Sequence, residues 1–183
     1  LLVGLPEPSP LRGLVQFFRG TALAGAERIP EARAAILESI RLLPDYSTPL
    51  FVAAELYVFS NEPGVAVDYL LRASRIDPQI AEQLDDYEAN SLLRRLGEAN
   101  DKRRAILLSE RLLKTGWSKG RPETISTMAV KVLEARVDEG DVAGAAEMVP
   151  RIVSPRDFAR LLTEKKFAAL RPTSIRLPTA PRM

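Results

Sequence analysis

The sequence predicts an all-α fold, a solenoid of about four stacked helix-turn-helix hairpins. The first reason is the stretch 47–78, which has the marks of two antiparallel helices joined by a tight turn. The second reason is an internal repeat, because one fixed shift of the sequence superposes this stretch on the preceding one. The superposed pairs are Leu23 with Tyr57, Ala32 with Ala66, Ile36 with Leu70, Ser39 with Ala73 and Pro44 with Pro78. Such a period is typical of units that cannot bury their apolar faces singly and therefore stack.

These residues resemble the tetratricopeptide repeat (TPR) family, whose pattern W-x2-L-G-x2-Y, then A-x3-F, then P recurs about every 34 residues. The slots of that pattern hold, in order, Leu50, Ala53, Ala54, Tyr57, Ala66, Leu70 and Pro78. The family's Trp and Gly are absent from this unit, as is common in degenerate repeats. The resemblance implies a right-handed α-solenoid of about four TPR-like hairpins with a C-terminal capping helix, over residues 9–170.

The first hairpin follows a lead, residues 1–8, that is predicted to be extended because it has two prolines and no helical period. Ser9 and Pro10 have the character of an N-cap and a first helical position, so a helix is predicted over about 10–25. Its apolar residues recur at three- and four-residue steps: Leu11, Leu14, Val15, Phe18 and Ala22. Pro30 opens the second helix and Pro44 ends it.

The second hairpin repeats these signals. Thr48 and Pro49 start a helix that is predicted to reach about Ser60, and its partner begins at Pro63 and ends before Pro78. Small residues are predicted where the two helices approach closely: Ala54, Ala66 and Ala73.

A third hairpin is predicted because residues 103–113 echo residues 33–43 at a separation of 70, which is two periods plus two residues. The insertion is placed after Pro78. This register puts Gly97 at the turn. It also puts Ala89 in the Leu slot, Leu93 in the Tyr slot, Asn90 in the small-residue slot and Lys102 in the Ala slot.

The remaining chain is predicted to hold a loop, a fourth hairpin and a cap. Residues 115–122 carry two glycines, a proline and Trp117, which is predicted to cap the groove between hairpins or, alternatively, to contact a ligand. The fourth hairpin is predicted over 123–140 and 141–153, with Pro150 kinking or ending its second helix. A capping helix then starts near Ser154, with an apolar stripe of Phe158, Leu161, Leu162, Phe167 and Leu170. Residues 171–183 are predicted to be a basic, disordered tail.

The composition argues against several classes of function. The 26 basic and 24 acidic residues nearly cancel, so no global field steers the chain to nucleic acid or to an anionic membrane. The absence of cysteine and histidine removes thiolate chemistry, the commonest general base and the commonest transition-metal ligands. No apolar run is long enough for a spanning helix, so membrane insertion is not predicted. We therefore predict a soluble non-enzyme without a cofactor. The compartment stays open, with the cytoplasm slightly favoured over the periplasm or an exported location.

The resemblance implies a concave groove lined by the first helix of each hairpin, in which a partner protein or peptide segment lies. In register, the residues one step after the family's Trp slot are Phe17, Phe51, Tyr87 and Val130. One turn further along, the groove positions fall to Thr21, Glu55 and Ser91, with Phe59 and Arg94 beyond them. The functional hypothesis is an aromatic-lined channel for a partner segment, oriented by Glu55 and Arg94. The alternative is that these aromatics pack between hairpins.

Four further interpretations stay open or are disfavoured. The chain begins without Met and is interpreted as a processed form or a fragment, which keeps open a regulatory or sensory module of a longer protein. A self-associating structural element, with its groove filled by a second copy or by the tail, is a separate alternative. Chaperone-tail binding is not predicted, because the groove positions lack the required basic residues. A basic cluster, Arg94, Arg95, Lys102, Arg103 and Arg104, is interleaved with Asp85, Asp86, Glu88, Glu98 and Asp101, which favours a solvated mixed-charge face over nucleic-acid binding.

Overall fold

The structure, a computed structural model, describes residues 10–58, 60–115, 122–152 and 154–170. Over these ranges the protein is all-helical, with nine α-helices, three short 3₁₀ helices and no strand, which confirms the predicted all-α class. The predicted lead and basic tail, together with Phe59 and Trp117, lie outside the described residues. Within the described part of the chain, no helix is both long and apolar enough to cross a membrane.

The chain divides into two compact units, Leu1–Ala105 and Ile106–Met183. The boundary falls inside α6 (Lys102–Lys114), so the predicted third hairpin is divided between the units, with α5 (Asp86–Glu98) wholly in the first.

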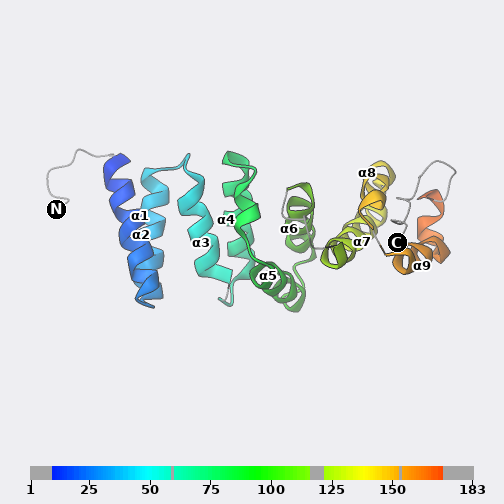
Figure 1. The fold of residues 1–183 in the computed structure, drawn as a ribbon, viewed down its shortest axis with the longest axis horizontal. Helices are drawn as coiled ribbons and strands as arrows, with labels where there is room; N and C mark the ends of the chain where they lie inside the picture. The colour runs from blue at the N-terminus through cyan, green and yellow to red at the C-terminus, as the bar shows by residue number, and fades with distance from the viewer. Residues whose placement is uncertain (1–9, 59, 116–121, 153, 171–183) are drawn as a thin grey trace, which may run out of the picture. The chain divides into compact units, whose positions relative to one another are not determined.

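The first unit begins with four helices whose bounds agree with those predicted to within about two residues. They are α1 (Pro10–Gly25), α2 (Ile29–Leu42), α3 (Ser47–Val58) and α4 (Pro63–Ile76). Helix α1 packs against α2, α3 packs against α4, and α2 packs against α3 (Figure 1). Because short turns join them, consecutive helices are antiparallel.

The internal repeat of the sequence is also a repeat of burial. Ala32 and Ala66 are both 0% exposed, as are Ile36 and Leu70, and Ser39 and Ala73. Since equivalent positions lie at the same depth, the two hairpins bury the same face of their second helix. The hydrophobic contribution of each large side chain in this face is about 2 kcal/mol.

Two glycines set how closely α1 approaches α2. A Cβ atom on Gly20 would lie 2.6 Å from Ile36 Cδ1, and one on Gly13 would lie 2.5 Å from Leu43 Cγ. No side chain larger than hydrogen fits at these places without displacing its neighbour. Gly20 lies one repeat before Ala54, which is 1% exposed, so both hairpins use a small residue at this close approach.

The turn of the predicted third hairpin is not at Gly97, and that prediction is wrong. Gly97 lies inside α5, which ends at Glu98, and the left-handed residue of the turn is Asn100, with φ of 55°. Asn adopts this conformation more readily than most non-glycine residues, so a glycine is not needed there.

The register predicted for the third hairpin places small buried residues at Asn90 and Lys102, but both side chains are exposed. The buried residues of α5 are Ala89, Ser91, Leu92 and Leu96. The cause lies in the inserted segment. It forms a 3₁₀ helix, η1 (Ile80–Gln83), and α5 then starts at its own capping box, in which Asp85 accepts from the Glu88 N–H and Glu88 accepts from the Asp85 N–H.

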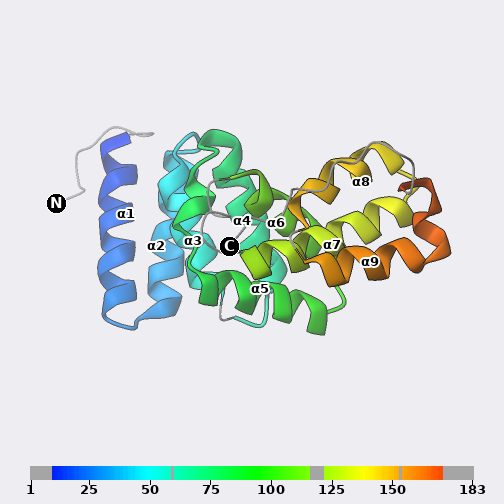
Figure 2. The same ribbon diagram turned by 45° about the vertical axis from the view of Figure 1, so that its right-hand side comes forward.

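The second unit contains α7 (Pro122–Asp138), α8 (Val142–Met148) and α9 (Pro155–Thr163), with 3₁₀ helices η3 (Val149–Arg151) and η4 (Lys165–Leu170). Helix α7 packs against α8 (Figure 2). As predicted, the second helix of this pair stops before Pro150, because proline cannot continue the backbone hydrogen bonding. The predicted capping helix is two pieces rather than one, because α9 ends at Thr163.

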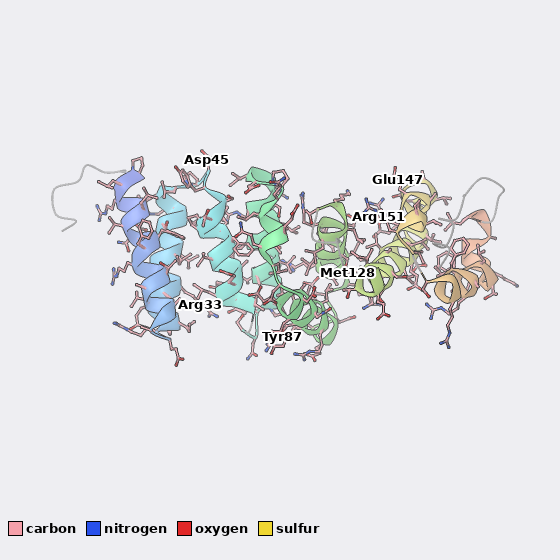
Figure 3. All side chains as sticks on the ribbon, in the orientation of Figure 1. Arg33, Asp45, Tyr87, Met128, Glu147 and Arg151 are labelled. Carbon is pink, nitrogen blue, oxygen red and sulfur yellow. The ribbon has the colours of Figure 1, made fainter. Side chains whose placement is uncertain are left out.

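The second unit is held by an arginine that bridges two elements. Arg136 on α7 donates to Glu110 Oε1 on α6 at 2.6 and 2.9 Å and to Asp141 Oδ2 at the start of α8 at 2.5 Å. Asp141 also caps α8 by accepting from the Gly144 N–H at 2.9 Å. A Cβ atom on Gly144 would collide with Arg136 and Asp141, so this network requires glycine there. Arg151 adds a bond to the Leu113 carbonyl, and Met128 lies in the core of the unit (Figure 3).

Candidate partner-binding face

The predicted groove residues are distributed over both units. Phe17 and Thr21 lie on α1, Phe51 and Glu55 on α3, and Tyr87, Ser91 and Arg94 on α5, all in the first unit. Val130 lies on α7 in the second unit, and Phe59 is outside the described residues. The candidate face therefore lies on α1, α3 and α5 of the first unit.

The burial of these side chains separates them into two groups. Phe51, Ser91 and Val130 are 5%, 8% and 6% exposed, so they belong to the cores of their units. Tyr87 is 72% exposed at the start of α5 (Figure 3), and Phe17, Thr21 and Glu55 are half-buried. Arg94 is exposed. The sequence pattern thus grouped accessible positions with buried ones, because both recur at helical spacing.

Glu55 is the residue of this face whose carboxyl pKa is shifted by its surroundings. Burial raises the pKa of its carboxyl above the usual value, and the charges of Glu88 and Asp85 raise that pKa further. These two neighbours form the capping box of α5, and α3 contacts α5 directly. The packing of the two helices therefore brings three carboxyl groups near one another at the start of α5, and their negative charges favour a cation.

Arg94 does not supply that cation. Its Nη1 donates to Glu98 Oε1 at 2.6 Å, one turn further along the same helix. Thr21 is likewise engaged locally, since its hydroxyl donates to the Phe18 carbonyl at 3.0 Å. Of the two residues predicted to orient a partner, Glu55 has the surroundings for that task and Arg94 is held by its own helix.

Sequence reasoning missed a cation–aromatic ladder that crosses three helices. Arg33 on α2 lies over the ring of Tyr57 on α3, with 4.2 Å between the guanidinium carbon and the ring centroid. Tyr57 stacks on Tyr69 of α4 at 6.0 Å, and Arg72 lies 5.5 Å from the Tyr69 centroid. Arg33 Nη2 also donates to the Leu56 carbonyl at 2.7 Å. The only sequence signal was Tyr57 in the Tyr slot, and nothing in the sequence placed Arg33 above it.

The α3–α4 turn is held by two arginines from the neighbouring helices. Arg33 of α2 binds the carbonyl of Leu56, and Arg95 of α5 donates to the carbonyl of Ser60 at 2.9 Å. The Leu56 carbonyl is one of those that the last turn of a helix leaves open, and the Ser60 carbonyl lies in the turn that follows α3. The two bonds fix the end of α3, and with it the helix that carries Glu55.

Two arginines of the predicted mixed-charge face, Arg94 and Arg104, are paired with acidic side chains. Arg104 forms a two-pronged contact with Asp68, at 2.7 and 2.8 Å, and a third bond to Asp101 at 2.7 Å. These carboxylates raise the pKa of the Arg104 guanidinium, and Arg104 lowers the pKa of Asp101. Together with the pair between Arg94 and Glu98, these contacts neutralise part of the cluster.

Across the described residues, no group of three or more His, Cys, Asp or Glu side chains is arranged to hold a metal ion. No protein-family model and no curated protein matches the chain.

Proposed function

We propose that the chain is a non-catalytic protein-interaction module, a right-handed α-solenoid of about four TPR-like hairpins with a C-terminal cap. The main support is the equal burial of positions one repeat apart in the first two hairpins, such as Ile36 with Leu70. Repeating units of this kind place equivalent helices side by side, and a row of equivalent helices presents an extended surface for a partner.

The proposed partner is an extended or helical protein segment that lies against α1, α3 and α5. Phe17, Thr21, Glu55 and Tyr87 would contact it, while Phe51 and Ser91 would support the face from the core. Because Glu55, Asp85 and Glu88 lie near one another and the exposed Tyr87 starts the same helix as Glu88, the segment is expected to carry a Lys or Arg next to an apolar residue. The ring of Tyr87 can cover the apolar residue, and the carboxylates can bind the cation.

A displayed library of random peptides of about 12 residues, selected on the full chain, tests this proposal. Selected peptides should be enriched in Lys or Arg beside an aliphatic or aromatic residue. Y87A and E55K should each weaken their binding by about tenfold, as expected for a contact residue near the centre of an interface.

The matched control is Y46S, which alters an exposed aromatic of the turn between α2 and α3 and should leave binding unchanged. Peptides that bind Y87A and E55K as tightly as the unaltered chain would contradict the proposed face, whatever their sequence.

A further inference from the structure

Helix α1 turns three of its large apolar side chains away from the rest of the unit. The residues buried by the rest of the unit are Gly13, Gln16 and Gly20, two glycines and an amide. On the opposite side, Leu11, Val15 and Phe18 are 55%, 37% and 65% exposed, and Ala22 is exposed as well. An amphipathic surface helix normally turns its apolar stripe to the core and its polar side chains to solvent.

These four residues, the outer stripe of α1, form one continuous surface. Their spacing of four, three and four residues places them within a narrow sector of a helix with about 3.6 residues per turn. Phe17 extends the stripe at one edge, since its ring meets that of Phe18 edge-on at 5.4 Å. Among the described elements, α1 packs against α2 and more lightly against α3, on its other side.

The internal repeat indicates what kind of element fits this stripe. The positions one repeat after Val15, Phe18 and Ala22 are Pro49, Val52 and Leu56 of α3. In α3 these positions are buried or half-buried, and α3 is packed between α2 and α4. Helix α2 is the element that precedes α3, and its Arg33 binds the Leu56 carbonyl. We infer that α2 helps to cover these positions of α3, whose counterparts on α1 are left open.

The charges of α1 define the chemistry of such a helix. The only charged residues of α1 are Arg12 and Arg19, so the helix carries two positive charges and no negative one. Arg19 is exposed and lies beside the stripe, four residues from Val15 and three from Ala22. A complementary helix has apolar residues at three- and four-residue steps and acidic residues along the edge that faces Arg19.

We propose that the outer stripe of α1 is a docking site for an amphipathic helix with an acidic edge, supplied by a partner protein. This site adjoins, at Phe17, the face of α1, α3 and α5 assigned to an extended segment above, but it does not depend on that assignment. A membrane surface fits less well, because an interfacial helix keeps its opposite face in water, whereas here that face is packed on α2 through Gly13 and Gly20.

The probe for this proposal is a fluorescent peptide with the α2 sequence, Ile29–Leu42, carrying R33E and R41E. The two changes convert a peptide with two acidic and two basic residues into one with four acidic residues. Anisotropy titration with the full chain should give saturable binding with a dissociation constant of about 10–100 μM, because a short helix must order on binding. Added salt should weaken the binding, and R19E should weaken it about tenfold.

Variant F18S decides the location. It should reduce the affinity of the peptide at least tenfold, with circular dichroism unchanged because Phe18 is already largely exposed. Y46S, an exposed aromatic of the α2–α3 turn, and Y87A, on the other proposed face, should both leave the affinity unchanged.

Three results would overturn the proposal. They are the absence of saturable binding, loss of binding in Y87A but not in F18S, and affinity for anionic vesicles that F18S removes while peptide binding persists. Sedimentation of the chain alone provides a further check. A concentration-dependent dimer that F18S dissociates would assign the stripe to a second copy and would also overturn the proposal.

Discussion

Helices α1 and α3 occupy equivalent positions in two successive hairpins, yet they treat their surfaces differently. Both place a small residue against the second helix of the hairpin, Gly20 in α1 and Ala54 in α3. Helix α3 lies between α2 and α4, so its remaining apolar residues are largely covered. Helix α1 has packing partners on one side, and Leu11 and Phe18 remain exposed. The comparison teaches that the repeat specifies contacts within a hairpin, whereas the cover of its outer face depends on a neighbour.

The largest expected effect tests whether equivalent core positions of the two hairpins contribute alike to stability. I36A and L70A remove equivalent side chains that are both 0% exposed, so each should lower the free energy of unfolding by about 2–5 kcal/mol. L70A should cost the larger amount, because α4 belongs to the enclosed hairpin and its surroundings can relax less. Urea unfolding monitored by circular dichroism measures both changes.

The control for this pair is L37A on α2, where the side chain is 37% exposed and the expected cost is below about 1 kcal/mol. If I36A were no worse than L37A, the equivalence of the two hairpins would be lost.

The next effect tests the close approach of paired helices. G20A places a Cβ atom 2.6 Å from Ile36 Cδ1 and 3.2 Å from the Ile36 backbone N, so the helices must separate, at a cost of about 1–3 kcal/mol. The reciprocal change A54G should cost about 1 kcal/mol through the weaker helix propensity of glycine. The measurement is again the midpoint of urea unfolding.

Gly97 is the matched control for G20A. It is also a glycine inside a helix, but a Cβ atom there would meet nothing within 4 Å. G97A should therefore stabilise the protein by up to about 1 kcal/mol, as a better helix former. A destabilised G97A would contradict the open surroundings of Gly97, and a G20A variant as stable as the unaltered chain would remove the close-packing argument.

The first two hairpins could be predicted from the sequence because their signals are local. Prolines at residues 30, 49 and 63 mark helix starts, and the repeat places small residues such as Ala66 opposite one another. The third hairpin could not be placed in the same way. Its first helix starts from a reciprocal side-chain cap between Asp85 and Glu88, and its turn uses Asn100, so no glycine or proline marks either end.

The candidate site could be predicted only in part, for a physical reason. Helical spacing tells which residues share a side of a helix, but the depth of that side depends on how closely the next helix packs. The sequence therefore predicted the same groove position for Phe51 and Tyr87, although Phe51 is 5% exposed and Tyr87 is 72% exposed. The environment of Glu55 was equally hidden, because Glu88 and Asp85 lie far along the chain from it and approach it only through the packing of α3 and α5.

The smallest expected effect concerns Glu55, whose equivalent in the first hairpin is Thr21, one repeat earlier. Burial raises the pKa of the Glu55 carboxyl, so the folded state binds this proton more tightly than the unfolded state does. The ionised carboxyl therefore reduces stability as the pH rises through the folded-state pKa, and this cost is absent below the ordinary value of 4.5. At neutral pH, E55Q should raise the free energy of unfolding by about 0.5 kcal/mol or less, and the gain should vanish at about pH 4.

The difference in stability between E55Q and the unaltered chain separates the effect of Glu55 from that of carboxyl groups whose pKa is lowered in the folded state. Asp101 and Asp141 have lowered pKa values because of Arg104 and of the Gly144 N–H with Arg136, so their contribution to stability is lost as the pH falls, equally in both proteins. E98Q is the control, since Glu98 is exposed and paired with Arg94, and its removal should give no gain at neutral pH. Urea unfolding at intervals between about pH 4 and pH 7 measures the difference. A gain for E55Q that stays constant over this range would mean that shape, and not charge, distinguishes this position from Thr21, and the face would then have no electrostatic preference for a cationic segment.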